Sequence, residues 1–124
     1  MMFKLIFLLS TILWSIATGF REGCMWYNDY RKRLPLDYHF WRNVEYLSVG
    51  LMILTYQGFL IFALGSWMFG EFLIYERCLQ YIQYGDFYVE QSPYKILGIE
   101  IPIKNIHYNL IAFIGIILII ISIV

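Results

Sequence analysis

The sequence predicts an all-α fold, a polytopic transmembrane helical bundle of four helices that forms one domain over residues 1–124. Hydrophobic residues make up 60% of the chain and charged residues only 15%, whereas charged residues are about a quarter of a typical soluble domain. A chain of 124 residues has too little interior to remove this much apolar surface from water. Aromatic residues reach 20%, with eleven Tyr and four Trp, which suits a protein with long membrane–water borders.

The first helix is expected over residues 2–33. Lys4 is the single charged residue among the first 20, and the rest of that run is apolar apart from Ser, Thr and Gly. A cleaved signal peptide begins in the same way, with small residues near Ser15, and this alternative stays open. We favour a membrane helix because Ser15, Gly19 and Gly23 recur every four residues. That row of small residues lets a neighbouring helix approach closely.

The second helix is expected over residues 38–56. Pro35 ends the preceding segment, since the residue before a proline avoids helical geometry. Asp37 then precedes the new helix as a suitable N-cap. The basic run at residues 31–33 is typical of a cytoplasmic anchor beside anionic lipid.

The middle of the chain allows two topologies. Residues 46–70 are uncharged and long enough to cross a bilayer as one tilted span. Alternatively, the chain turns at Gln57 and Gly58 and forms a hairpin of two shorter helices over residues 38–56 and 59–83. The hairpin places the polar Gln57 at a turn instead of in the middle of the bilayer.

The distribution of basic residues favours the hairpin. With a single span, the nine Lys and Arg residues divide five to four between the two sides of the membrane. With the hairpin they divide eight to one, and only Lys4 remains on the opposite side. The second division is the one that the positive-inside rule produces. We therefore expect basic loops in the cytoplasm and both termini on the other side.

The last part of the chain combines a polar segment and a final helix. Residues 84–104 contain several Gly and Pro residues and are expected to form an interfacial loop. Within it, residues 99–104 alternate between apolar and polar side chains, as in a short extended segment, and Pro102 restricts that segment to an edge. Residues 105–124 are rich in Ile and contain no Asp, Glu, Lys or Arg. They are expected to form the last membrane helix.

The hairpin would gather polar side chains near one membrane face. The candidate polar cluster comprises Arg21, Glu22, His39, Arg42, Glu45, Glu71, Tyr75, Glu76 and Arg77. Glu71 would lie about 9 Å deeper than Arg77 at 1.5 Å per residue, where an acid is costly unless it is neutral or paired. Its expected partner is Arg21 or Arg42. The favoured interpretation of the cluster is an interhelical salt-bridge layer that fixes the register of the helices.

A metal centre or an enzyme is an alternative interpretation of the same region. Its ligands would come from His39, Glu45, Glu71, Glu76 and His107. These are the residue types of carboxylate-rich iron or manganese centres. The chain has only two His residues and no Glu-x-x-His pair, so an enzymatic role is not favoured and no cofactor is expected.

Two stretches of the chain carry a family resemblance. The first joins residues 19–23 (GFREG) with Trp26, His39 and Glu45, and the second joins residues 72–77 (FLIYER) with Gln91 and Ser92. Through them the chain resembles small integral membrane proteins of phage and bacterial genomes. The resemblance implies the hairpin topology and a place in the bacterial inner membrane. That family has no assigned activity, so the resemblance implies no catalytic residues.

The function expected from these observations is a structural or interaction role in a membrane. The partners would be the lipid bilayer and either further copies of the chain or another membrane protein. The formal net charge is zero, which gives no reason to expect nucleic acid as a partner. A holin-like or pore-forming protein is a further alternative, but holins often have a strongly charged tail and this chain ends in Ile-Ser-Ile-Val.

Overall fold

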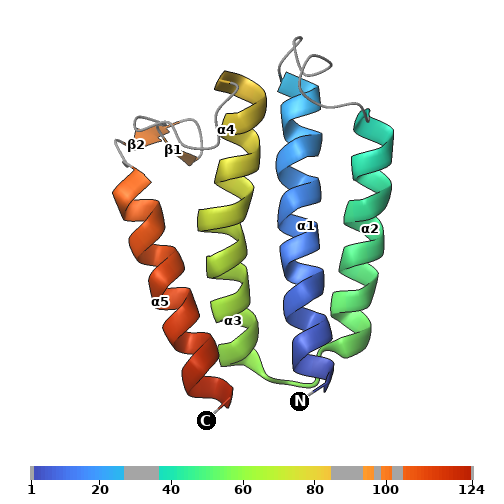
Figure 1. The fold of residues 1–124 in the computed structure, drawn as a ribbon, viewed down its shortest axis with the longest axis vertical. Coiled ribbons are helices and arrows are strands. Elements are labelled where there is room, and N and C mark those ends of the chain that lie inside the picture. Colours follow the sequence, from blue (N-terminus) through green and yellow to red (C-terminus); the bar gives the residue numbers. More distant parts are fainter. Residues whose placement is uncertain (1, 27–36, 85–93, 97–98, 102–104, 124) are drawn as a thin grey trace.

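The computed structural model describes residues 2–26, 37–84, 94–96, 99–101 and 105–123. Its helices are α1 (Met2–Trp26), α2 (Tyr38–Thr55), α3 (Leu60–Phe69), the π-helical segment η2 (Gly70–Tyr75), α4 (Glu76–Tyr84) and α5 (Asn105–Ile123). α3, η2 and α4 follow one another without a break and are called the central helix (residues 60–84). The chain runs up and down in alternation, so that its two ends lie at the same end of the molecule (Figure 1). The predicted helical fold with four helices is confirmed.

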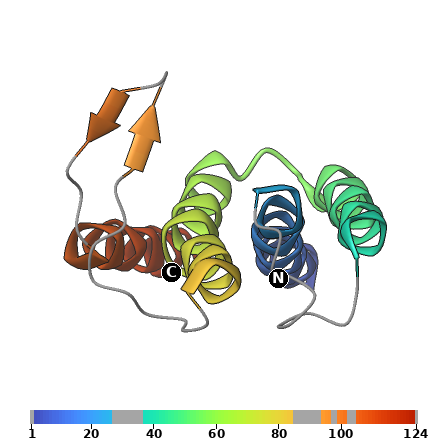
Figure 2. The ribbon, with the colours of Figure 1, turned by 90° about the horizontal axis from the view of Figure 1, so that it is seen from above.

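The four helices stand side by side in a row instead of closing into the bundle that we expected. Seen from above, the order is α5, the central helix, α1 and α2 (Figure 2). α2 packs against α1, and α5 packs against α3 and η2, so the two outer helices lie on opposite sides of the central pair. Composition alone could not distinguish a row from a bundle, because large apolar side chains can face a protein interior or lipid equally well.

The chain reverses direction between α2 and α3. Tyr56 ends α2 with its backbone N–H donating to the carbonyl of Met52 at 3.0 Å. Gly58 follows with a φ of 79°, in the left-handed region that a residue without a Cβ adopts most easily. The structure therefore has the hairpin and not the single helix over residues 46–70. At the other end of α2, the predicted N-cap is confirmed, since Asp37 accepts a hydrogen bond from the backbone N–H of Phe40 at 3.2 Å.

The central helix differs from an ordinary α-helix at residues 70–75. The predicted helix over residues 59–83 corresponds to residues 60–84, but its middle six residues form the wider turns of a π-helix. Such segments are rare and frequently occur at functional sites. Nothing in the pattern of apolar residues indicated this change, because the apolar character continues through it.

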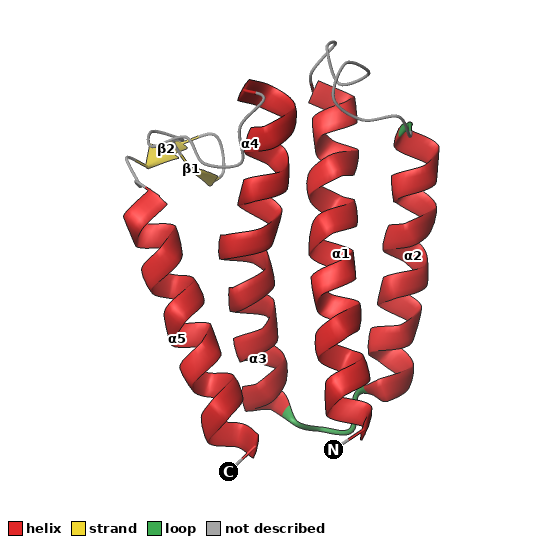
Figure 3. Ribbon diagram, viewed as in Figure 1, coloured by secondary structure: helices red, strands yellow, loops and turns green. Residues whose placement is uncertain are grey.

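A short β-ribbon joins the central helix to α5 (Figure 3). β1 (Tyr94–Ile96) pairs with β2 (Ile99–Ile101) in antiparallel register, with Lys95 opposite Glu100. We expected an extended segment over residues 99–104 but no partner strand before it. Residues 85–93, 97–98 and 102–104 of the expected interfacial loop lie outside the described residues, as do residues 27–33 of the first predicted helix.

Two kinds of contact hold neighbouring helices together. Near the end of the molecule where the chain begins, Phe7, Phe62 and Ile119 form a buried apolar cluster that joins α1, α3 and α5. Further along, α3 and α5 approach each other at Gly65 and Gly115. A small apolar cluster and close backbone contacts therefore take the place of a large central core.

One helix in the described part of the chain, Met2–Met25, is long and apolar enough to cross a membrane by length and composition. Its 24 residues correspond to the first predicted helix. A shorter apolar helix runs over His107–Ile123, within α5.

Candidate functional site

A polar network connects three helices near the end of α1. Arg21 of α1 donates from Nε to Oε2 of Glu45 on α2. Its Nη2 atom also lies 3.8 Å from Oε1 of Glu22, the next residue of α1. Tyr75 of η2 donates its hydroxyl to Oε2 of Glu22. Glu45, Arg21, Glu22 and Tyr75 therefore form a continuous chain of contacts, here called the Glu45–Tyr75 network.

Helix geometry explains why two adjacent residues reach different neighbours. Successive residues of an α-helix point about 100° apart, as 3.6 residues per turn require. Arg21 is thereby directed at α2, and Glu22 at the central helix, which lies on the other side of α1. The side chains of Arg21, Glu22 and Glu45 are mostly buried, with exposed fractions of 19%, 30% and 16%. Little water competes for these contacts, so each bond between charged partners is stronger than it would be on a protein surface.

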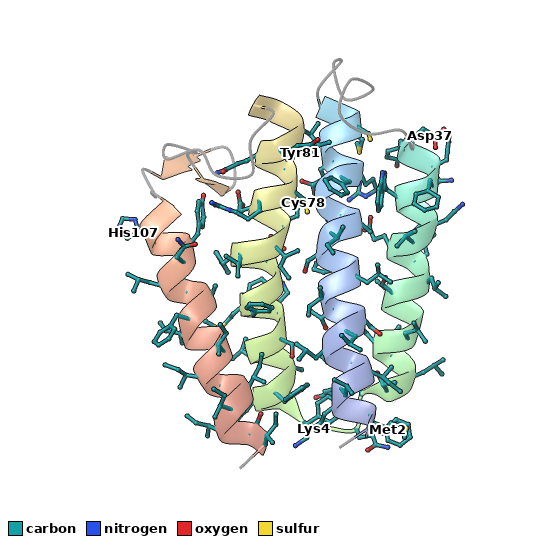
Figure 4. The ribbon with its side chains drawn as sticks, in the orientation of Figure 1. Met2, Lys4, Asp37, Cys78, Tyr81 and His107 are labelled. Carbon is teal, nitrogen blue, oxygen red and sulfur yellow. The ribbon has the colours of Figure 1, made fainter. Side chains whose placement is uncertain are left out.

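The predicted row of small residues faces the central helix. A Cβ atom on Gly19 would lie 2.8 Å from Cβ of Cys78 and 2.9 Å from the carbonyl oxygen of Tyr75. Figure 4 labels Cys78 on the central helix beside α1. A Cβ atom on Gly23 would lie 2.8 Å from Cβ of Ile82. Ser15, the third member of the row, sits directly against Gly70, whose missing side chain leaves space for its hydroxyl.

This close approach is what brings Glu22 within reach of Tyr75. Tyr75 lies in the π-helical segment, beside the part of α1 that carries Gly19. A Cβ at Gly19 would push the central helix away from α1. The packing row and the polar network are therefore parts of one interface and depend on each other.

Two further acids lie on the central helix beside this network. Glu71 is half-buried in η2, and Glu76 is only 5% exposed at the start of α4. In the part of the chain that the structure describes, neither carboxylate takes part in a salt bridge. Glu71 interacts electrostatically with Glu22, and Glu76 interacts with both of these acids and with its neighbour Arg77. Burial of a carboxylate is costly, and of these two acids Glu76 interacts with a cation whereas the electrostatic contact given for Glu71 is with another acid, so Glu71 experiences repulsion in this interface.

The cation expected to pair with Glu71 lies elsewhere. Arg21 is engaged by Glu45 and Glu22. Arg42 projects beside its own helix, with its guanidinium carbon 5.6 Å from the ring centroid of Tyr38 and 6.0 Å from that of Tyr46. The prediction of a Glu71 partner is therefore wrong. Arg42 cannot reach Glu71 because α1 lies between α2 and the central helix, and Arg21 is directed away from the central helix toward Glu45 of α2.

The residues of the metal alternative do not converge. His39 is exposed on α2, and His107 is exposed on α5 (Figure 4 labels His107 at the edge opposite α2). Glu45 is bound by Arg21 between α1 and α2, away from Glu71 and Glu76 on the central helix. Within the described ranges, no three His, Cys, Asp or Glu side chains come together in an arrangement that could hold a metal ion. The row of helices is the physical reason, because it places the two histidines on its two outer members.

Some contacts of the site were not anticipated from the sequence. Trp41 packs its ring against Phe20 of α1, with centroids 4.8 Å apart. Tyr38 lies four residues before Arg42 and Tyr46 lies four residues after it, and both rings contact its guanidinium. That spacing is visible in the sequence and places all three side chains on one face of a helix. The aromatic setting of Arg42 could therefore have been predicted from the sequence.

No protein-family model, no curated protein and no solved structure matches this chain. The resemblance to small membrane proteins of phage and bacterial genomes stays a prediction.

Proposed function

We propose that this chain is a small polytopic integral membrane protein with a structural or interaction role, whose four helices cross the bilayer and associate with further copies of the chain. The observation that carries the proposal is the distribution of side chains in the described helices. Large apolar side chains face outward, and small polar side chains are buried between the helices. This distribution is the reverse of the one expected in water.

The outward-facing side chains are found along every long helix. Ile53 and Leu54 on α2 are 70% and 78% exposed, and Leu60 at the start of α3 is 70% exposed. Phe113 on α5 is 58% exposed. Leaving one such side chain in water costs about 1.5–3 kcal/mol relative to burying it. Contact with lipid acyl chains removes this cost, so the apolar outer surface suits a bilayer better than water.

Three buried serines satisfy their hydroxyl groups within their own helices. Ser15, Ser48 and Ser66 are all 0% exposed. Each donates its hydroxyl to the carbonyl four residues earlier, at 2.9, 2.8 and 2.9 Å respectively. Such bonds leave no unsatisfied donor in hydrocarbon, and small residues of this kind are typical of contacts between membrane helices.

The lengths of the helices are compatible with four crossings. α2, with 18 residues, is the shortest and extends about 27 Å at 1.5 Å per residue. The hydrocarbon core of a bilayer is about 30 Å thick. Arg21, Arg42 and Arg77 lie toward one end of the helix axes, whereas Lys4 lies toward the other end and donates to the carbonyl of Ser122 at 3.0 Å. By the positive-inside rule the arginine end faces the cytoplasm of a bacterial inner membrane.

Self-association is proposed through the outer helices. α2 and α5 each have a broad side that no other described helix covers, because they are the outer members of the row. These sides are apolar, and lipid or a second copy can cover them. The Glu45–Tyr75 network would hold three helices in register so that these surfaces keep a fixed shape.

The topology is tested by placing single cysteines in a chain that lacks its own. Cys24→Ser and Cys78→Ser remove both native thiols. The introduced cysteine is then the single thiol that can react. His39→Cys marks the end of α2 that carries the arginines, and Gln57→Cys and Ile123→Cys mark the other end. All three positions are exposed. A membrane-impermeant maleimide is then applied to intact cells and to inverted vesicles.

The proposal expects position 57 to react together with position 123 and from the side opposite to position 39. The protein must also stay in the membrane pellet after carbonate extraction. Extraction by carbonate, or reaction of all three positions from one side, would overturn the proposal. A single span over residues 46–70 would place position 57 inside the bilayer, where it would not react at all.

A further inference from the structure

Arg21 has a further partner that the Glu45–Tyr75 network does not include. Its Nη1 atom donates a hydrogen bond to the thioether sulfur of Met25 at 3.2 Å. Met25 follows Arg21 by four residues, so the two side chains are neighbours on one face of α1. Among the methionines that the structure describes, Met25 is the one whose sulfur accepts a hydrogen bond from a cation.

The three nitrogen atoms of the Arg21 guanidinium contact three different partners. Nε donates to Glu45, and Nη2 lies 3.8 Å from Oε1 of Glu22. Nη1 is left for Met25, whose neutral sulfur is only a weak acceptor. The acceptor at Nη1 can therefore change in strength while the contacts of Arg21 with the two carboxylates are kept.

Met25 is accessible at the surface of the molecule. The residue is 53% exposed, and the hydrogen bond that its sulfur accepts is also exposed. Met25 lies about 6 Å farther along α1 than Arg21, at 1.5 Å per residue, and so close to the polar end of the helix. Met52 and Met68, by contrast, are partly buried within α2 and α3. A water-soluble oxidant can therefore reach Met25 more easily than these two residues.

We infer that Met25 is a site of reversible oxidation that acts on the Glu45–Tyr75 network through Arg21. The oxidant is hydrogen peroxide, and the product is methionine sulfoxide. A lone pair of the sulfur forms a bond to one peroxide oxygen and the O–O bond breaks. The second oxygen takes the proton of the first and leaves as water, so the sulfur is oxidised and the peroxide is reduced. This site does not require the membrane location proposed above.

Oxidation changes the strength of the contact at Nη1. A sulfoxide oxygen is polar and accepts more strongly than a thioether sulfur, and its bond to a guanidinium is charge-assisted. The methionine side chain has three rotatable bonds, so residue 25 can draw back and place the new oxygen against Nη1. Arg21 is then held by oxygen acceptors alone. Oxidation of Met25 should therefore stabilise the fold, whereas oxidation of a methionine in a core disrupts packing.

The test compares thermal unfolding of the purified chain in detergent before and after treatment with hydrogen peroxide. Cys24→Ser and Cys78→Ser remove the thiols, and mass spectrometry of peptides reports which methionines have gained oxygen. Oxidation of Met25 is expected to raise the melting temperature by about 3 °C, as a stronger bond to a charged group predicts. Treatment with methionine sulfoxide reductases should restore the original melting temperature.

Four variants separate the effect of Met25 from that of other methionines. M25L removes the oxidisable sulfur and R21Q removes the guanidinium, so both should abolish the rise. M2L is the matched control and should keep the rise, because Met2 is 72% exposed but lies at the other end of α1. M25Q places a carbonyl oxygen near Arg21 without any oxidation and should unfold at a higher temperature than M25L. This last comparison decides the question even if R21Q fails to fold.

A rise in the unaltered protein and in M2L that is absent from M25L and R21Q supports the site. Oxidation of Met2 without oxidation of Met25 would overturn it, because the sulfur would then be closed to peroxide. A melting temperature that stays the same after oxidation of Met25, or that falls equally in the unaltered protein and R21Q, would overturn it as well. Carbonate extraction reports membrane residence separately in each case.

Discussion

Gly65 of α3 and Gly115 of α5 face each other so closely that a Cβ atom on either would lie 2.7 Å from the carbonyl oxygen of the other. In each case the nearest atom is a backbone oxygen, which cannot move aside cheaply. We expect Gly115→Ala to separate the two helices and to lower the free energy of unfolding by about 1–3 kcal/mol, the usual cost of overpacking. Thermal unfolding of the purified protein in detergent measures the effect.

Gly50 supplies the matched control for this prediction. It is also a glycine within a helix, but a Cβ atom there would meet nothing within 4 Å. Gly50→Ala is expected to leave the melting temperature unchanged or to raise it, because alanine favours a helix by about 0.5–1 kcal/mol relative to glycine. Equal destabilisation by both substitutions would mean that α3 and α5 do not meet at Gly65 and Gly115.

The hydroxyl of Tyr75 is predicted to stabilise the contact between the central helix and α1. Tyr75→Phe keeps the ring and removes the bond to Glu22, which leaves a mostly buried carboxylate with fewer partners. The expected loss is about 1–3 kcal/mol in the free energy of unfolding. Tyr46→Phe is the control, because Tyr46 is 64% exposed. The prediction fails if the two variants unfold at the same temperature.

Arg21 and Glu45 are predicted to stabilise each other across α1 and α2. A double-mutant cycle with Arg21→Gln, Glu45→Gln and the combined variant isolates their coupling, which should be about 0.5–3 kcal/mol for residues in one network. Both side chains are mostly buried, so the coupling should persist at high salt, unlike that of a surface pair. A coupling near zero, or one abolished by salt, would place the pair at an exposed surface instead.

The hairpin and several local features of the fold follow from the sequence. The distribution of Lys and Arg favoured a turn at Gln57 and Gly58, where the structure has it. Asp37 was identifiable as a cap because its side chain is short and precedes a helical run. The cap depends on residues close together in the chain, and the turn was inferred from the positions of Lys and Arg along it, so neither prediction required the order in which the helices pack.

The partners of individual charges do not follow from the sequence in the same way. Arg21 and Arg42 are equally plausible partners for Glu71 when the order of helices is unknown. In the row, α1 stands between α2 and the central helix, so Arg42 is confined to its own side of α2. The π-helical segment is a second case, because its apolar and aromatic residues are equally compatible with α-helical turns.

Glu71 is predicted to be a source of repulsion rather than a partner in a salt bridge. The sequence predicts a cation beside this carboxylate, and in that case loss of the carboxylate would weaken the packing of the helices. In the structure Glu71 is half-buried and interacts electrostatically with two other acids, Glu22 and Glu76. Glu71→Gln keeps the shape and removes one charge, so it should raise the free energy of unfolding by about 1 kcal/mol, within the range of couplings between neighbouring groups. Glu22→Gln should do the reverse, since Glu22 binds Arg21 and Tyr75. Melting temperatures that fall to the same extent in both variants would show that Glu71 has a stabilising partner after all.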